Sequence, residues 1–234
     1  MDWNTLAKAL FGADHGIAQD GDFLHGSATF DGQHLAIIGT TGHAPIGVDL
    51  ALAQAGKVLE TMARHPGRPM LLLIDTQGQQ LRRRDELLGI NRAMAHLGMA
   101  IDLARRRGHR VLGLVYDQAL SGGFITSGLI ADACDALPEA EIRVMRIPAM
   151  ARVTKLPEAL LASLSESNPV FAPGVANYVA MGAVESLWEG DLAQHLLQAL
   201  RTPAEGDRRA ARGAQRGGRA LAAAVSTAVA HGDA

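Results

Sequence analysis

The chain has 234 residues, of which 48% are hydrophobic and 20% are charged, so a sizeable core is feasible and disorder over most of the length is excluded. A net charge of −2 argues against a general nucleic-acid binder. Cys134 is the only cysteine, which excludes an intrachain disulfide and a cysteine metal cluster and fits a reducing, cytoplasmic setting. The N-terminal segment lacks the pattern of a secretory signal, and no apolar run reaches the ~18 residues of a membrane span.

The N-terminal quarter of the chain predicts a helix, a β-hairpin and a second helix. Residues 1–13 favour a short amphipathic helix. Two strands are expected at 22–30 and 34–39, joined by a tight turn at 30–33. The segment TTGHAPIG then predicts a loop, and residues 48–64 predict a helix that ends before a segment rich in proline and glycine.

The middle of the chain alternates between buried strands and helices. The segment PMLLLID is a continuous apolar run, as expected for a strand that is buried on both faces. Strands are expected at 69–75, 111–116 and 141–147, with helices at 85–107 and 124–136 between them. This alternation indicates an α/β fold, in which parallel strands are joined by right-handed crossovers.

The chain after Pro148 becomes helical and then changes in composition. Helices are expected at 155–166, 173–181 and 189–200. We therefore expect one domain over residues 1–202 and an Ala- and Arg-rich tail over 203–234 that is helical or flexible. The tail is interpreted either as a solvated, partly frayed segment or as a segment that docks on a partner or an acidic carrier protein. Its arginines are Arg208, Arg209, Arg212, Arg216 and Arg219.

The best candidate site is the turn at Ser121, Gly122 and Gly123, which follows one predicted strand and precedes a predicted helix. Open α/β sheets bind ligands at the carboxyl ends of their strands, and the first amides of a helix lack intrahelical acceptors. We therefore predict Gly122 and Gly123 as backbone oxyanion donors; the alternative is a close-packed corner that needs small residues. Ser121 is interpreted as a helix cap rather than a nucleophile, because no spacing ties a histidine to it.

Two further segments are expected on the same side of the sheet. Asp75-Thr76-Gln77-Gly78 predicts a turn after a buried strand, in which Asp75 is a cap or a turn residue. The loop after the strand at 34–39 supplies amides for a second donor set. The residues that we expect to bind substrate are Gln77 and Gly78 from the turn and Thr41, Gly42 and His43 from the loop. Paired carboxylates for acid–base chemistry are not evident in the sequence, and no metal site is predicted.

Two of these segments resemble a known superfamily. LLLIDTQG, followed by a long helix and then VLGLVYDQALSGG, resembles the crotonase superfamily and, within it, the carboxyltransferase subunits of acyl-CoA carboxylases. The segment SGGFITSGLIADACDALPEAEIRVMRIPAMARVTKLP is more similar to the gamma-subunit family of biotin-independent malonate decarboxylases, and the resemblance covers residues 20–200. It implies a ClpP/crotonase-like α/β fold with repeated ββα units and C-terminal helices.

The resemblance also implies a function and partners. The chain is expected to be the gamma subunit of a carboxy-lyase that acts with a beta subunit, converting malonyl-S-acyl-carrier protein to acetyl-S-acyl-carrier protein and CO2. An alpha acyl-transferase subunit and an acyl-carrier delta subunit with a dephospho-CoA-derived prosthetic group complete the complex, and no cofactor, including biotin, is expected on this chain.

Several points stay open at this stage. Gly122 and Gly123 are expected to hold either the malonyl carboxylate or the enolate oxygen, and the partner or water is expected to supply the proton. Two other functions stay open for the chain: a subunit of a biotin-dependent acyl-CoA carboxyltransferase, or a non-catalytic crotonase-like scaffold.

Overall fold

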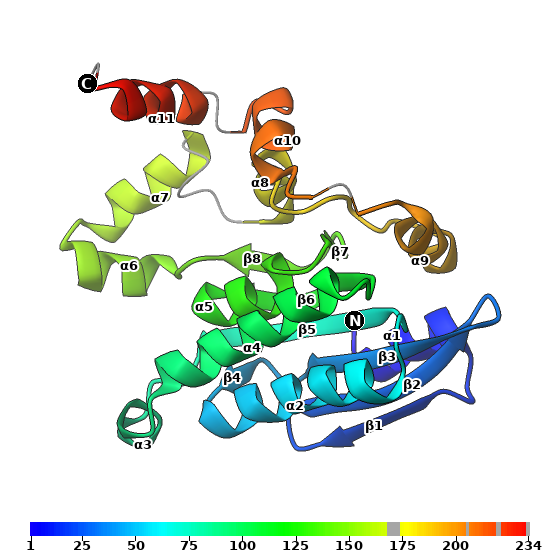
Figure 1. Ribbon diagram of the computed structural model, residues 1–234. Coiled ribbons are helices and arrows are strands. Elements are labelled where there is room, and N and C mark those ends of the chain that lie inside the picture. Colours follow the sequence, from blue (N-terminus) through cyan, green and yellow to red (C-terminus); the bar gives the residue numbers. More distant parts are fainter. Residues whose placement is uncertain (168–173, 205, 219–220, 233–234) are drawn as a thin grey trace.

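A mixed eight-stranded sheet with helices on both faces forms the centre of the protein (Figure 1). The structure is a computed structural model that describes residues 1–167, 174–204, 206–218 and 221–232. The strand order is β1-β2-β3-β5-β6-β7, with β4 paired to β5 and β8 paired to β6. Within the described residues, no helix combines the length and the apolar composition that crossing a membrane requires.

The antiparallel part of the sheet comes first in the chain. Its elements are α1 (Trp3–Phe11), β1 (Gly16–Asp20), β2 (Phe23–Phe30) and β3 (Gln33–Thr40). The predicted hairpin is confirmed: Phe30 pairs with Gln33, and the φ angles of Asp31 and Gly32 are 47° and 75°, as a two-residue hairpin turn of type I′ requires. β1, which was not predicted from the sequence, extends the hairpin by pairing with β2.

The parallel part of the sheet follows, and the predicted alternation of strands and helices is confirmed there. β3, β5, β6 and β7 run parallel to one another. The elements are β4 (Ala44–Ile46), α2 (Val48–Arg64), β5 (Met70–Gln79), α3 (Arg83–Leu87), α4 (Ile90–Arg106), β6 (Val111–Leu120), α5 (Ser121–Phe124), the π-helix η1 (Ile125–Leu129), β7 (Ala133–Ala136) and β8 (Glu141–Arg143).

Helices make up most of the remaining chain. They are α6 (Ile147–Thr154), α7 (Glu158–Ser167), α8 (Val175–Ala180), α9 (Leu192–Arg201), α10 (Arg209–Gln215) and α11 (Ala222–His231). The last three predicted helices of the main domain correspond to α7, α8 and α9, although position 173 lies outside the described residues. α6 was not predicted.

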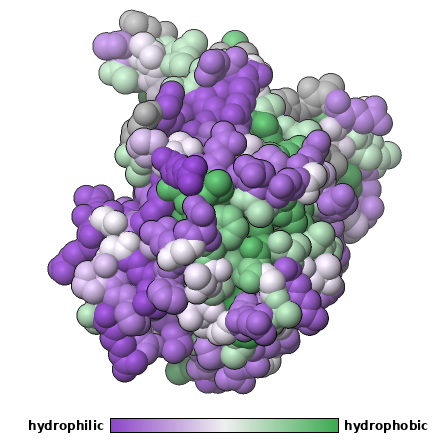
Figure 2. Space-filling view, turned by 90° about the vertical axis from the view of Figure 1, so that its right-hand side faces the viewer, coloured by the Kyte–Doolittle hydropathy of each residue, from purple (hydrophilic) through white to green (hydrophobic). Residues whose placement is uncertain are grey.

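The two faces of the sheet bury separate hydrophobic cores. Leu71 and Leu73 of β5 face a core that α1 and α9 cover, whereas Leu72 packs with side chains of α2 and α4 on the other face. This alternation explains why β5 is apolar at every position of its first half. On the side of the molecule that lies to the right in Figure 1, apolar residues form an area framed by hydrophilic ones (Figure 2).

The predicted turn at Asp75-Thr76-Gln77-Gly78 is wrong, because β5 continues through it to Gln79. β4, which lies inside the segment predicted as a loop, provides the parallel partner: Ala44 pairs with Thr76 and Ile46 with Gln79. Asp75 is therefore a strand residue and neither a cap nor a turn residue.

The helix predicted over 85–107 is two helices, because Gly89 breaks it with a φ of 78°. Asp85 is buried in α3, and its Oδ1 accepts a hydrogen bond of 2.9 Å from the Val48 N–H. Asp85 therefore provides a hydrogen-bond acceptor for the N-terminus of α2, which has no side-chain cap of its own. The hydrogen bond from the Val48 N–H also lowers the pKa of the Asp85 carboxyl.

The helix predicted over 124–136 is also wrong, since helical structure ends at Leu129 and the chain returns to the sheet as β7. Asp132 redirects the chain: one carboxylate oxygen accepts from the Val111 N–H at 2.8 Å and the other from Arg105 at 2.8 Å. Cys134 consequently lies in β7 and not in a helix, and it is buried there as a free thiol.

Three arginines of the tail bind the chain's own backbone or an acidic side chain. The Arg216 guanidinium donates to the carbonyls of Val179, Val184 and Glu185. Arg209 donates to the Leu129 carbonyl at 2.6 Å, and Arg212 forms an ion pair with Glu185. Arg216 stays exposed while it makes these hydrogen bonds, so the contacts attach the described part of the tail to the main domain, and the interpretations of the tail as solvated or as docked on a partner stay predictions. Arg219 lies outside the described residues, and the domain boundary at 202/203 stays a prediction.

Candidate functional site

A tightly packed corner forms where the ends of β5 and β6 meet α5. We call Gly78, Ser121, Gly122 and Gly123 the glycine corner. A Cβ atom on Gly123 would lie 2.9 Å from the Gly78 Cα and 2.9 Å from the Thr76 Oγ1, and one on Gly78 would lie 2.9 Å from the Ser121 Cβ. These distances are shorter than van der Waals contacts, so close packing accounts for glycine at positions 78 and 123.

Gly122 differs, because close packing with the backbone does not explain it. A Cβ atom at this position would meet only the flexible end of Gln79, with Oε1 at 3.1 Å. The Gly122 N–H donates to that Oε1 at 3.3 Å, and Gly122 is only half-buried. The acceptor of this amide is the end of a flexible side chain, which a substrate oxygen can displace, so Gly122 can act as a backbone oxyanion donor once Gln79 moves away.

Two side-chain hydroxyls donate hydrogen bonds to the backbone carbonyls of the glycine corner. The Ser127 hydroxyl donates to the Gly123 carbonyl at 2.6 Å, and the Thr126 hydroxyl donates to the Gly122 carbonyl at 2.9 Å. Both hydroxyls come from η1, which continues directly from the four-residue α5. Because a peptide plane contains the carbonyl of one residue and the N–H of the next, these two hydrogen bonds fix the planes that carry the Gly123 and Phe124 amides, so the Gly123 amide is preorganised before any ligand arrives.

Ser121 does not cap the helix, contrary to the prediction. Leu120 occupies the N-cap position without a side-chain hydrogen bond, and Ser121 is the first helical residue with a φ of 54°. A left-handed conformation is uncommon for a residue with a side chain and is concentrated at functional sites. Within the part of the chain that the structure describes, no hydrogen bond joins the Ser121 hydroxyl to a histidine, which a serine nucleophile would need as its base.

The second predicted donor set is largely occupied. The Thr41 N–H donates to the Asp22 carbonyl at 3.0 Å, and the His43 N–H donates to the Asp75 Oδ2 at 2.9 Å. These two amides are therefore not free to bind a substrate oxygen. Substrate binding by Thr41, Gly42 and His43 through other groups stays a prediction, as it does for Gln77 and Gly78.

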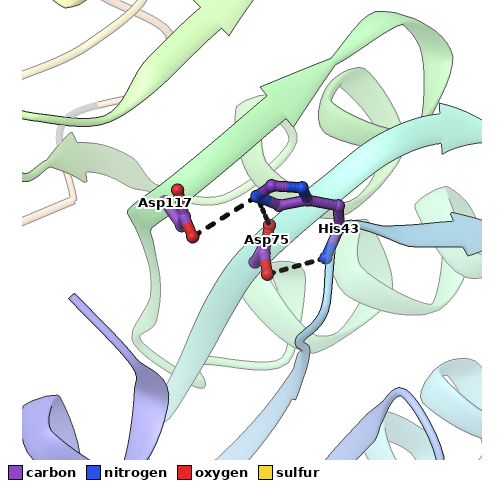
Figure 3. Close-up of side chains that lie close together, drawn as sticks. All are labelled: His43, Asp75 and Asp117. Carbon is purple, nitrogen blue, oxygen red and sulfur yellow. Dashed lines mark hydrogen bonds and ion pairs between the residues drawn. The ribbon is translucent and has the colours of Figure 1, made fainter.

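One cluster of titratable side chains was missed by the sequence analysis. His43, Asp75 and Asp117 come together from the segment before β4, from β5 and from β6 (Figure 3). The His43 Nε2 lies 3.4 Å from the Asp117 Oδ2 and 3.7 Å from the Asp75 Oδ1. Burial raises the pKa of Asp75, Asp117 adds to the increase, and the His43 amide opposes it. Paired carboxylates are thus present, although the sequence analysis found none.

A signal for this cluster exists in the sequence. Asp75 and Asp117 each follow an apolar run that forms a buried strand, and these two strands are parallel neighbours. The pairing register shifts between them after Ile74 and resumes where Thr76 pairs with Ala119, so β6 contributes extra residues opposite Asp75. That shift, which the sequence does not reveal, allows the two carboxylates to approach each other.

Comparisons with known proteins agree with this architecture. Residues 41–233 match the family model described as "Malonate decarboxylase gamma subunit". The malonyl-S-ACP:biotin-protein carboxyltransferase MADD of Malonomonas rubra is 34% identical over 170 residues, which are 66% of this chain and 58% of that protein. The chain thus aligns with little more than half of that curated relative.

Two solved structures are similar to this fold. A Pseudomonas malonate decarboxylase hetero-tetramer in complex with coenzyme A contains a chain with a TM-score of 0.81 and 24% identity, with 99% of each chain covered. Transcarboxylase 12S, with hydrolyzed methylmalonyl-coenzyme A bound, gives a TM-score of 0.71 at 21% identity and covers 87% of this chain and 43% of that one. These similarities confirm the predicted crotonase-like α/β fold.

Proposed function

The chain belongs to the malonate decarboxylase gamma-subunit family, and from this membership we propose that it acts with a beta subunit to decarboxylate malonyl-S-acyl-carrier protein. The products are CO2 and acetyl-S-acyl-carrier protein. The single observation that supports this chemistry most directly is the Gly122 amide, which points at an oxygen acceptor within a rigid, close-packed corner.

The reaction requires few catalytic side chains from this chain. The bond between the carboxylate carbon and the α-carbon breaks, and its electron pair moves into the thioester to give an enolate. We assign the amides of Gly122 and Gly123 to the enolate oxygen, because the position that the Gly122 N–H addresses is held by the neutral carbonyl oxygen of Gln79. One such donor contributes about 3–4 kcal/mol to a transition state. The partner or water supplies the proton to the α-carbon.

A partner subunit also fits the surface of the C-terminal helices. Every residue of α6 is at least partly exposed, with Val153 at 68%, and α6 and α7 extend beyond the sheet (Figure 1). Ile125, two residues after Gly123 of the glycine corner, is 53% exposed. We propose that these exposed apolar side chains belong to one interface, since a contiguous apolar patch on a surface marks a protein interaction site. A beta subunit bound here would cover them and enclose the corner from water.

The remaining parts of the proposal rest on family membership. They are an alpha acyl-transferase subunit, an acyl-carrier subunit that presents the malonyl group on a dephospho-CoA-derived arm, and a reaction without biotin. A cytoplasmic location is part of the same proposal and is compatible with the buried free thiol of Cys134. Gln77, Gly78, Thr41, Gly42 and His43 are proposed to line the path of the thioester.

A second candidate function is favoured by one observation, the 34% identity to a malonyl-S-ACP:biotin-protein carboxyltransferase. In that reaction the carboxyl group would be passed to a biotin carrier instead of leaving as CO2. The two functions share the enolate and therefore the same amides. They differ in the acceptor of the carboxyl group, which an experiment can identify.

The test reconstitutes the purified chain with and without a beta subunit and supplies malonyl-S-acyl-carrier protein. We expect CO2 and acetyl thioester in equal amounts with the partner and no turnover by the chain alone. Full decarboxylation by the isolated chain would contradict the need for a partner. Turnover that requires a biotinylated carrier and stops on addition of avidin would establish the second function instead.

A further inference from the structure

In the cluster of His43, Asp75 and Asp117, only His43 has a place in the proposed function, along the path of the thioester, and the two carboxylates have none. Asp75 precedes Gly78 by three residues on β5, which places the cluster about 10 Å along the strand from the glycine corner. We propose that these three side chains bind one divalent transition-metal ion, of the class of Zn²⁺ or Mn²⁺.

The separations between the three side chains suit such an ion. One nitrogen or oxygen atom from each side chain lies within 4.8 Å of the others, and the His43 Nε2 is 3.4 Å and 3.7 Å from its carboxylate neighbours. A point equidistant from three such atoms lies about 2.1 to 2.4 Å from each of them. Zinc binds imidazole nitrogen and carboxylate oxygen at about 2.0–2.2 Å, so an ion fits after a small contraction.

A buried oxygen without a partner points to a cation. The Asp75 side chain is only 3% exposed, and its Oδ1 has no hydrogen-bond partner in the described structure, although its Oδ2 accepts from the His43 N–H. A buried carboxylate oxygen without a hydrogen bond is costly, and this carboxylate also faces a second one. A metal ion that binds the Asp75 Oδ1 would neutralise both charges.

The backbone holds the three ligands in place. The His43 N–H donates to the Asp75 carboxylate, and the Asp75 N–H donates to the Thr40 Oγ1 at 3.3 Å. The register shift between β5 and β6 places Asp117 beside them. His43 adopts a left-handed conformation with a φ of 52°, which directs its ring toward the two carboxylates (Figure 3). Ligands that are fixed by their surroundings bind a metal with less reorganisation.

The donor set and its exposure define the class of ion. One imidazole and two carboxylates suit Zn²⁺, Mn²⁺ or Fe²⁺ better than a thiolate-seeking metal. The side chains of His43 and Asp117 are 52% and 46% exposed, so water or an oxygen ligand can fill the remaining coordination positions. The site is therefore of the open type, with three protein ligands and accessible positions.

The test measures metal binding directly and needs no activity assay. Full-length protein is treated with a chelator, and Zn²⁺ is titrated in competition with a chromophoric chelator while Mn²⁺ is followed by electron paramagnetic resonance. We expect one ion per chain and a nitrogen coupling from His43. His43→Ala and Asp117→Asn should weaken binding at least tenfold, whereas His96→Ala, which changes an exposed histidine of α4, should leave the affinity unchanged.

The alternative is a metal-free ion pair in which a charged His43 bridges the two carboxylates. It predicts no binding tighter than about 1 mM or an affinity that His43→Ala does not alter, and either result would overturn the proposal. Asp117→Asn keeps the test decisive if His43→Ala misfolds, because the Asp117 side chain is half exposed and Asn preserves its volume.

Discussion

Substituting alanine at Gly123 and, separately, at Gly122 tests whether the glycine corner acts through its backbone amides. At Gly123 the added methyl would lie 2.9 Å from the Gly78 Cα and 3.1 Å from the Gly78 carbonyl carbon. Neither of these atoms can move without its strand, so the corner must open. At Gly122 the methyl meets only the end of the Gln79 side chain, which can rotate away. The two variants thus make the same chemical change with different consequences for the backbone.

The size of each effect can be worked out from these contacts. To bring the added methyl of residue 123 to an ordinary separation of about 3.4 Å or more from the Gly78 Cα, the backbone must shift by about 0.5 Å. Overpacking of this kind costs about 1–3 kcal/mol of stability. Catalytic groups tolerate displacements of about 0.5 Å, and one oxyanion donor is worth about 10²–10³ in kcat. We therefore expect Gly123→Ala to lose about 10²-fold in turnover, and Gly122→Ala to stay within about tenfold with little change in stability.

The assay compares complexes of each variant with the beta subunit. Assembly is checked by size-exclusion chromatography, stability by urea unfolding, and single-turnover decarboxylation by release of CO2 from the malonyl thioester. Equal turnover of the Gly123→Ala and wild-type complexes, at equal assembly, would refute the catalytic role of the corner and support a scaffold. A larger loss in Gly122→Ala than in Gly123→Ala would show that occupancy of the ligand space, and not donor geometry, limits the reaction.

Three further predictions concern the fold. Burial raises the pKa of Asp135 to about 6 against about 3.9 in an unfolded chain, so the folded state retains a proton between these values and its stability falls as pH rises through that window. Asp135→Asn keeps an acceptor for Ser186 and should raise the free energy of unfolding above pH ~7 by up to about 3 kcal/mol; a loss of stability would contradict this. Arg216→Ala removes three hydrogen bonds to backbone carbonyls and should cost about 1–3 kcal/mol in urea unfolding, with faster amide exchange in α10; unchanged values would mean that the tail does not dock. Burial raises the pKa of the Cys134 thiol, so a thiol reagent should label it only after denaturation, and rapid labelling of native protein would refute its burial.

The strands were the most predictable part of the fold, because burial on both faces leaves a continuous apolar run. β5 and β6 were found in this way, and the hairpin was found from its turn residues. Their carboxyl ends could not be placed. β5 continues through Asp75 to Gln79 because β4 pairs with it there and β6 pairs with Thr76 from the other side, and these pairings depend on the folded chain and not on local pattern. The helix predicted over 124–136 failed for the same reason, since β6 offers Ala133 a parallel partner.

The candidate site was predicted in part. Its glycines were found, because a glycine pair between a strand and a helix is a local signal. The close contact of Gly78 with Gly123 and the approach of Asp117 to Asp75 are both contacts between segments distant in sequence. A single sequence contains no record of such contacts, so the distinction between a packing glycine and an amide-donating glycine required the structure.

The hydroxyl of Thr76 connects the two parts of the site. It donates to the Ala44 carbonyl at 2.7 Å, accepts from the Gly78 N–H at 3.0 Å, and lies 2.9 Å from where a side chain on Gly123 would begin. β4 is thereby bound to the glycine corner, and β4 starts one residue after His43. We therefore expect a displacement of β4 to move both the amides and the imidazole. Because a metal ion at His43 would restrain the same strand, we predict that occupancy of the metal site alters turnover by changing the geometry of the amide donors, which a comparison of turnover with and without bound metal tests.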